Sequence, residues 1–561
     1  MRLLHILLCS LLSFVLVGGC PPVGGDDDDA TGDDDDVTGD DDDATGDDDD
    51  ATGDDDDATG NTAPTANDDS ATTQVGAAVW IDVLDNDTDP EGDPLEIEVL
   101  SPASNGSVVQ DSGGVEYTPD PGFVGVDTFD YLVGDDGGLT DGATVTVEVI
   151  CVGGLQLLSE AYTGGPGSAS SRGPQVSADG TFVVFESDAD DLAPGDTNGT
   201  TDVYLADRST GEVERVSMGW DGSEPDGVAS YPVISADGAW VAYQSNATNL
   251  VDDDTNGLWD IFLWERATGT TTRASRMSDG GQSDGASTDA TLSEDGRYVA
   301  FTSFGDLTPV VTYGTTDVYV FDRVDETTEL ISVSMGGTDG IQTSAYPGIS
   351  GDGNLVVFSS LAWDLVPGDT DGFIDIFVRN RATSTTTRVN LPTGVLAADN
   401  ASNQPVISGD GNTVAFVSNA TNLVVGDTNG QTDVFSVALG TGTIERISVD
   451  SGEGQSTHVS GHVQLSADGR FAAFLSEGIL DADGTAGVYD LYVRDRTLGT
   501  TAMASYGCGG QPSAEDLNAP VGITGDGTGI VFSTDEADLL LPASDTNGAD
   551  DIFWVPNPLA P

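Results

Sequence analysis

The chain contains no lysine, so sixteen arginines are its strongly basic residues, against 98 aspartates and glutamates in 561 residues. The formal net charge at pH 7 is −82. Such a charge repels nucleic acid and anionic lipid headgroups, so neither is expected as a partner. It favours cations, above all Ca²⁺, which binds carboxylate and carbonyl oxygens. An acidic surface also keeps an exported protein soluble, so the charge alone does not decide between these interpretations.

Histidine is almost as scarce, with only His5, His458 and His462 in the whole chain. The last two are four residues apart, but the glutamate of the zinc-protease helix motif is missing between them. The sequence has no G-x-S-x-G motif either, and it offers little for a Ser-His-Asp set. We therefore expect a protein that is not an enzyme, although the many carboxylates leave a glycosidase pair open.

The N-terminus has the pattern of an export signal. Arg2 is followed by an apolar run from Leu3 to Val17, which is short for a membrane span, and then by small residues. The ending Val17-Gly18-Gly19-Cys20 resembles the lipobox of bacterial lipoproteins. This resemblance implies that residues 1–19 are removed and that Cys20 carries the lipid that anchors the chain to a membrane. The alternative is ordinary signal cleavage, with Cys20 incidental.

An acidic low-complexity segment fills most of residues 20–60. The heptad DDDDATG starts at Asp26 and repeats five times up to Gly60, with Val37 replacing one alanine. Such a segment cannot bury a core, and its charges repel one another, so we expect an extended tether of up to about 130 Å. Loose calcium collection by the aspartate runs is the alternative role.

Residues 61–150 alternate apolar and polar side chains in short runs separated by Gly, Pro, Asn and Asp, which predicts a β-sandwich. The segment contains Ala63-Pro64-Thr65-Ala66-Asn67-Asp68-Asp69, Val83-Leu84-Asp85-Asn86-Asp87-Thr88-Asp89 and Asp127-Thr128-Phe129-Asp130-Tyr131. These motifs resemble the cadherin-like, Ig-like repeats of bacterial surface adhesins. The resemblance implies possible calcium ligands at Asp68, Asp69, Asp87, Asp89 and Asp93, whereas the alternative is that these residues only form turns.

The rest of the chain, residues 151–561, is built from seven repeats. An Asp-Gly turn recurs every 57 or 58 residues, at Asp179, Asp237, Asp295, Asp352, Asp410, Asp468 and Asp526. Each unit has four short strand patterns: one before this turn, one after it, a third after a long polar loop, and a fourth after a tight turn that is often Thr-Gly. Four strands repeated seven times predict an all-β fold with a seven-bladed β-propeller, preceded by the small sandwich.

The seventh unit ends after its third strand, Asp551–Val555, so its fourth strand has to come from elsewhere. Ser159 stands twenty residues before Asp179, the same spacing that Ser217 keeps to Asp237. We therefore expect residues 155–160 to complete blade seven and close the ring, which removes an open sheet edge. The Ser-Ala-Asp-Gly and Val-Ala-Phe/Tyr phrases resemble the WD40-like (PD40) repeats of TolB-type propellers. That resemblance implies a fold and no particular activity.

The long loop between the second and third strands carries the pattern D-x-[DN]-G-x-x-D in five units. Its oxygen-bearing residues are Asp196, Asn198 and Asp202; Asp254, Asn256 and Asp260; Asp369, Asp371 and Asp375; Asp427, Asn429 and Asp433; and Asp545, Asn547 and Asp551. The pattern resembles half of the calcium loops in dockerin-like and integrin-propeller repeats. It predicts structural Ca²⁺ as a cofactor, and the alternative is a framework of Asx turns that starts the third strand.

Strand alternation would place the Asp-Gly and Thr-Gly turns on one face of the ring, and the long loops and the connections between blades on the other. Cys151 precedes a fourth strand and Cys508 follows one, so we expect them on opposite faces and without a disulfide between them. An oxidising exported compartment would favour the bond.

Together these features predict a lipid-anchored protein of the cell envelope, at the outer membrane or the cell surface. Its propeller would act as a binding or scaffold module for an unidentified protein or glycan. The alternative function is an extracytoplasmic propeller hydrolase or lyase that acts on polysaccharide.

Overall fold

The computed structural model describes residues 61–560 apart from short gaps at 112, 121–122, 152–153, 310–313, 393–396, 509–512, 514–515, 536–538 and 540–546. The predictions for the signal segment, Cys20, the acidic tether and Asp545 lie outside these residues. Every regular element in the described part is a β-strand, as predicted from the sequence. No helix in these residues is long and apolar enough to cross a membrane.

The first domain is a sandwich of two sheets. One sheet has the order β1 (Asp69–Gln74), β7 (Thr140–Ile150), β6 (Gly125–Gly134), β3 (Glu96–Leu100), and the other has the order β2 (Val79–Ile81), β5 (Gly114–Pro119), β4 (Gly106–Asp111). Buried and exposed residues alternate along β6, so that Phe129, Tyr131 and Val133 point into the core. Tyr117 of β5 stacks on Phe129, with the ring centroids 6.3 Å apart. The predicted sandwich is confirmed.

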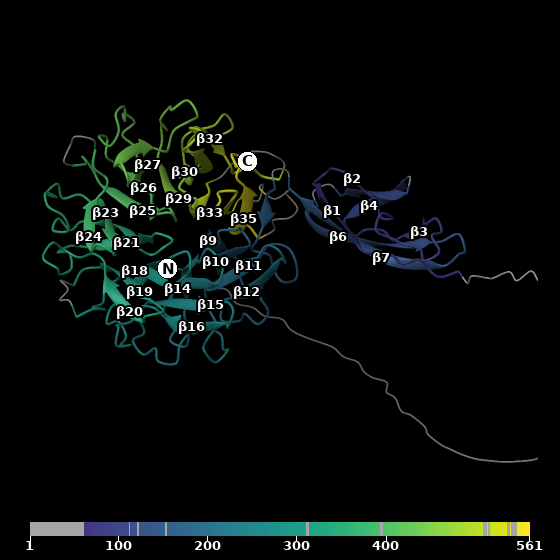
Figure 1. Ribbon diagram of the computed structural model, residues 1–561, viewed down its shortest axis with the longest axis horizontal. Helices are drawn as coiled ribbons and strands as arrows, with labels where there is room; N and C mark the ends of the chain where they lie inside the picture. Colours follow the sequence, from purple (N-terminus) through teal and green to yellow (C-terminus); the bar gives the residue numbers. More distant parts are fainter. Residues whose placement is uncertain are drawn as a thin grey trace, which may run out of the picture. The chain divides into compact units, whose positions relative to one another are not determined.

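Seven four-stranded antiparallel sheets follow, and Figure 1 shows them arranged as blades around a ring, with β9, β21, β25, β29 and β33 nearest the centre. The strands of blades one to three are β9 (Ser171–Val176), β10 (Phe182–Ser187), β11 (Asp202–Asp207) and β12 (Glu212–Arg215); β13 (Ala229–Ile234), β14 (Trp240–Ser245), β15 (Asp260–Glu265) and β16 (Thr270–Arg273); β17 (Ser287–Leu292), β18 (Tyr298–Ser303), β19 (Asp317–Asp322) and β20 (Thr327–Leu330). Those of blades four to six are β21 (Ser344–Ile349), β22 (Leu355–Ser360), β23 (Asp375–Asn380) and β24 (Thr385–Arg388); β25 (Ser402–Ile407), β26 (Thr413–Ser418), β27 (Asp433–Ala438) and β28 (Thr443–Arg446); β29 (Ser460–Leu465), β30 (Phe471–Ser476), β31 (Asp490–Asp495) and β32 (Thr500–Met503).

Blade seven combines β33 (Asn518–Ile523), β34 (Gly529–Thr534) and β35 (Asp551–Pro556) with β8 (Gln156–Leu157), a strand from the other end of the domain. Phe553 and Trp554 pair with Leu157 and Gln156, respectively. The seven-bladed propeller is therefore confirmed, and its ring is closed by strands from both ends. The closing strand is shorter than the six residues expected.

The recurring Asp-Gly turn has a structural explanation. In blade one, the Ser177 hydroxyl donates to Asp179 at 2.8 Å and accepts the Phe182 amide at 2.9 Å, while Asp179 accepts the Thr181 amide at 3.0 Å. Gly180 follows with a φ of 75°, which a residue with a Cβ rarely adopts. The hydroxyl-to-aspartate bond recurs in the other six blades, with a threonine as donor in blade seven.

The core of each blade contains a cross-strand aromatic pair between its second and third strands. Phe185 and Tyr204 form this pair in blade one, with ring centroids 6.0 Å apart, and the pairs of the other six blades lie at 5.8 to 6.1 Å. Hydrophobic clusters also run between successive blades, so each blade packs on its neighbours.

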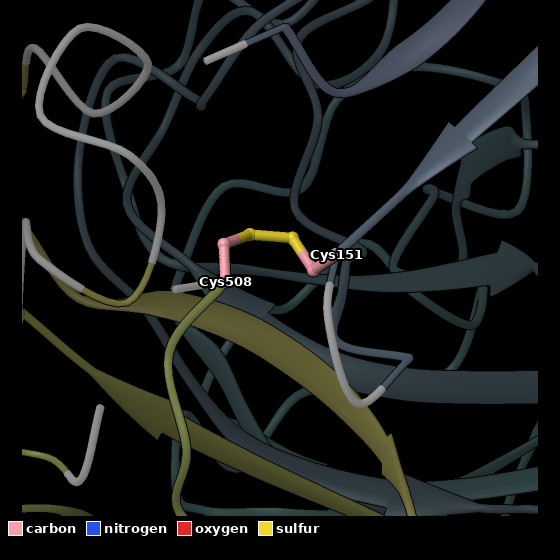
Figure 2. Close-up of a disulfide and its surroundings, with 2 residues drawn as sticks. All are labelled: Cys151 and Cys508. Atoms are coloured by element: carbon pink, nitrogen blue, oxygen red, sulfur yellow. A yellow bond between two sulfur atoms is a disulfide. The ribbon is translucent and has the colours of Figure 1, made fainter. Parts of the chain in front are cut away.

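The expectation that the two cysteines of the folded body stay apart is wrong. Cys151 and Cys508 form a disulfide, with their Cα atoms 4.4 Å apart (Figure 2). Both are fully buried in one hydrophobic cluster with Leu155, Leu517 and Leu539. Strand order alone placed them at opposite ends of fourth strands. It did not account for the packing of the two cysteines themselves, which lie outside the strands and are buried in the same interior cluster.

We predict that removing this disulfide destabilises the propeller by about 2–5 kcal/mol, the usual loss for a native disulfide, because the bond closes a loop of 357 residues in the unfolded chain. Equilibrium unfolding in guanidinium chloride of the Cys151→Ser/Cys508→Ser variant, compared with the wild type, measures the loss. Peptide mapping without reductant provides the control. A free thiol at either position in the native protein would contradict the prediction.

Candidate functional site

The long loops all end at an aspartate that is the first residue of the third strand. Asp202 is completely buried there, and it accepts the Ser217 hydroxyl at 2.5 Å. The Ser217 hydroxyl in turn accepts the Val203 amide at 3.1 Å, which ties the fourth strand to the third. The same bond from the fourth-strand side to the aspartate occurs in the other six blades, with Asn390 replacing the serine in blade four. Blades three and six, which lack the acidic motif, also have it, so this aspartate has a structural role.

The asparagine of the motif forms an Asx turn. Asn198 accepts the Thr200 amide at 2.9 Å and donates to Asp202 at 2.9 Å. Asn256 and Asn429 make the same two bonds, and Asn547 accepts the Ala549 amide. These bonds correspond to the turn framework that the sequence left as an alternative.

A buried arginine from the fourth strand enters the acidic loop in four blades. In blade four, Nη1 of Arg388 lies 3.1 Å from Asp369, and Nη2 lies 2.6 Å from both Asp371 and Asp375. In blade one, Nη1 of Arg215 lies 2.9 Å from Asp196 and 3.4 Å from Asp202. Blade two pairs Arg273 with Asp253 and Asp254, and blade five pairs Arg446 with Asp427 and Asp433.

The repeats themselves show that the arginine and the acidic loop belong together. Blades three and six have Leu330 and Met503 at the arginine position, and their loops lack the motif. A buried guanidinium needs acceptors and stabilises buried carboxylates, which explains why the arginine occurs in four of the five units that carry the motif. The loop motif by itself does not point to these arginines. Their co-occurrence with the motif in four repeats was the signal that could have revealed them.

A single guanidinium does not hold every carboxyl group of a loop in its charged form. The raised pKa values of the innermost carboxyl groups show this. Burial raises the pKa of Asp202 to about 6 and that of Asp375 to about 7, against the opposing effect of their hydrogen bonds and of the arginine. Asp317 of blade three forms no ion pair with an arginine among the described residues, and burial raises its pKa to about 7 as well.

Carboxylate oxygens of Asp369, Asp371 and Asp375 lie within 4.8 Å of one another, a spacing that could suit a metal ion. However, the Arg388 guanidinium contacts all three carboxylates. The residues therefore do not fit a resident Ca²⁺ in this loop. The arginines of blades one and five pair with the equivalents of Asp369 and Asp375, and Arg273 of blade two pairs with the equivalent of Asp369 and with Asp253. In blade seven Leu157 stands at the arginine position, so calcium stays a prediction for that loop, of which Asp545 lies outside the described residues.

The predicted ligands in the sandwich also hold backbone groups. Asp68 accepts the Thr144 amide at 2.9 Å, Asp87 accepts the Asn67 amide at 2.7 Å, and Asp89 accepts the amides of Glu91 and Asp93 at 2.9 Å. Burial raises the pKa of Asp69. Within the described residues these carboxylates do not form a compact group of metal ligands.

The class of protein is now clear: the described chain is an Ig-like sandwich followed by a seven-bladed β-propeller. Residues 61–148 match the family model of the bacterial Ig domain. No curated protein matches the chain.

Three solved structures are similar to part of the chain. An oligogalacturonate lyase in complex with manganese is 13% identical at a TM-score of 0.44, with 82% of this chain and 98% of that chain covered. A putative TolB from Agrobacterium tumefaciens is 15% identical at 0.34, with 63% and 96% covered. A puromycin-hydrolyzing peptidase from Mycobacterium tuberculosis is 14% identical at 0.41, with 65% and 50% covered. All three scores are below 0.5, so these likenesses support no argument about activity, and the blade count rests on strand pairing.

We predict that Arg388→Met destabilises the protein by about 3–5 kcal/mol, because it leaves the buried carboxylates of Asp369 and Asp375 and the half-buried one of Asp371 without their cation. Millimolar Ca²⁺ should restore part of this loss, since the vacated carboxylates can then bind a metal. Denaturant unfolding with Ca²⁺ or with EDTA measures both effects. Leu330→Met, at the same position of blade three, is the matched control and should cost less than about 1.5 kcal/mol. Equal stability of the two variants would contradict the role assigned to Arg388.

A pH dependence follows from Asp317, whose pKa in the folded state is about 7, above the unfolded value of about 3.9. The native state therefore holds a proton that the unfolded state releases, and its stability falls as the pH rises between these two values. Asp317→Asn should flatten this fall and should be the more stable protein at about pH 8. Unfolding free energies measured across this range test the prediction, and the exposed Asp136→Asn controls for net charge. A steeper fall in the Asp317 variant would contradict it.

Proposed function

We propose that this chain is a lipid-anchored binding or scaffold protein of the cell surface, whose propeller contacts a protein or a glycan. The lipobox-like Val17–Cys20, the acidic heptads and the Ig-like domain support the anchored and displayed part of the proposal. The binding part rests on the face of the propeller that carries the long loops and the connections between blades.

The observation that carries the binding role is a set of large apolar side chains exposed on this loop face. They are Tyr162, Trp220, Phe304, Met335 and Trp363, each with 50–64% of its surface exposed. Aromatic residues and methionine are enriched in protein interfaces, where they provide most of the contact energy. All of these side chains except Phe304 lie on or beside loops that a buried arginine holds, which lowers the entropy cost of binding.

Two residues of this set, Met335 and Trp363, lie around Asp364 together with Ile341, which is 38% exposed. The Met335 amide donates to the Asp364 carbonyl at 2.9 Å, and the Ile341 amide donates to its carboxylate at 3.2 Å. Trp363 is the next residue in the chain. Met335, Ile341 and Trp363 therefore form one patch where the connection from blade three meets the loop of blade four, which we call the Asp364 patch.

A polysaccharide hydrolase or lyase is the second candidate, and one group of residues favours it. Arg172 on β9 forms an ion pair with Asp188 and lies 3.9 Å from Asp550. Glu186 is the cross-strand neighbour of Arg172, and burial raises its pKa. An acid with a raised pKa beside an arginine and a second carboxylate is a combination that glycan cleavage uses.

We predict that the soluble chain that starts after Cys20 binds intact cells of its own bacterium saturably, and that Met335→Ser/Trp363→Ala weakens this binding at least about tenfold. Both residues are exposed, so the fold should persist. Flow cytometry with a fluorescent chain measures the binding.

Leu498→Ser is the control, because Leu498 is 67% exposed in the turn between β31 and β32, on the opposite face. Glu186→Gln should leave cell binding unchanged, since an amide oxygen can still accept the Tyr231 amide that Glu186 accepts at 2.7 Å. Binding that does not saturate, or an equal loss in the Leu498 variant, would refute the binding role of this face. Polysaccharide cleavage that is abolished by Glu186→Gln would favour the enzyme.

A further inference from the structure

A groove of about 490 Å³ runs along the outer strand of blade two where it faces blade three. It extends from Trp220, in the connection that enters blade two, past Thr270 and Thr272 of β16, to Arg276 and Arg323. Its volume lies within the range of small-ligand sites.

The groove offers an aromatic surface. Trp220 is 64% exposed and has no ring partner among the described residues. Trp240 is covered by the guanidinium of Arg323 at 3.9 Å, and Phe321 by that of Arg276 at 5.0 Å. The arginines at one end are thus held by stacking, while the indole of Trp220 at the other end is free to receive a ligand.

Hydrogen-bonding groups of both kinds surround this surface. Arg273 is 96% buried at its side chain, and its Nη2 lies 3.2 Å from Asp253. Arg276 pairs with Glu326 at 3.2 Å. The Nε of Arg273 and the Nε of Arg276 have no hydrogen-bond partner within the described residues, which is costly for buried donors. Arginine and carboxylate side chains therefore stand next to one another along one wall.

The neighbouring pair of blades provides a comparison within the chain. The groove between blades one and two has Tyr162, Phe182 and Arg266 where the first groove has Trp220, Trp240 and Arg323. Glu212 and Glu214 stand in it where the first groove has Thr270 and Thr272. The two grooves share their construction, but only the one between blades two and three combines a free indole, hydroxyls and several arginines.

We propose that the groove between blades two and three is a saccharide-binding site, an inference that rests on the proposed binding function and names its ligand class. A sugar ring presents an apolar C–H face that can stack on Trp220. Its hydroxyl groups both donate and accept, so they match the alternation of arginine donors with the carboxylates of Asp253 and Glu326. Nucleic acid is disfavoured by the four carboxylates that line the groove and by the charge of the whole chain.

Tryptophan fluorescence and calorimetric titration of the soluble full chain test the proposal. The probes are chitohexaose, cellohexaose and maltohexaose as neutral chains, and hexamannuronate as an acidic chain. We expect at least one probe to bind with a Kd below about 1 mM, and Trp220→Ala to weaken its binding about tenfold or more. Thr272→Glu, which copies Glu214 of the other groove, should weaken hexamannuronate more than the neutral chains.

Leu498→Ala, an exposed position in the turn between β31 and β32 that lines neither groove, is the control and should leave the affinity unchanged. Equal losses in the Trp220 and Leu498 variants, or no binding of any probe at about 10 mM, overturn the saccharide site. Cell binding through the Asp364 patch would still stand in that case. Conversely, if Met335→Ser/Trp363→Ala abolishes cell binding but leaves the affinity for the oligosaccharide unchanged, the saccharide site stands independently of the Asp364 patch.

Discussion

The pairing of β35 with β8 is the interaction on which the rest of the propeller depends. Each of the other six blades forms from one contiguous stretch of chain, whereas blade seven is complete only when residues 392 positions apart meet, as in the bond from Ser159 to Asp551. Without it, the outer edge of β35 would present unpaired backbone groups, and the packing between blades seven and one would lose its support. The disulfide from Cys151 to Cys508 secures the same region, in the cluster between blades six and seven.

Within this ring, the acidic sequence places carboxylates in buried positions, where an unpaired charge is costly, and residues of the same blade compensate for it. An aspartate at the start of every third strand is buried to bond the fourth-strand side, and five loops carry the rest of the acidic motif. The fourth strand supplies an arginine to four of those loops, whereas blade seven has Leu157 at that position. A guanidinium provides several fixed donors and its charge does not depend on an external ion, so these loops keep their shape whatever the metal concentration. Leu330 and Met503 stand where no such cluster has to be neutralised.

Repetition provides the framework, and departures from repetition provide the candidate sites. Tyr162 and Trp220 occupy equivalent places, yet the strands beneath them differ in charge through Glu212 and Glu214 on one side and Thr270 and Thr272 on the other. Blades three and four similarly differ from the others in exposing the Asp364 patch. A propeller can accumulate such differences one blade at a time, because each blade contacts only its neighbours.

The sequence by itself determined the fold class, the number of blades and the need for a closing strand, because these follow from local periodicity and from a spacing that repeats seven times. It also identified the loops that carry unusual chemistry. It did not reveal that Arg215, Arg273, Arg388 and Arg446 occupy those loops, because strand pairing brings them from about twenty residues away, and their side-chain direction depends on the pleat of the folded sheet. The disulfide and the Trp220 groove were likewise decided by tertiary structure alone, since each depends on how connections between blades pack, for which linear spacing has no signal.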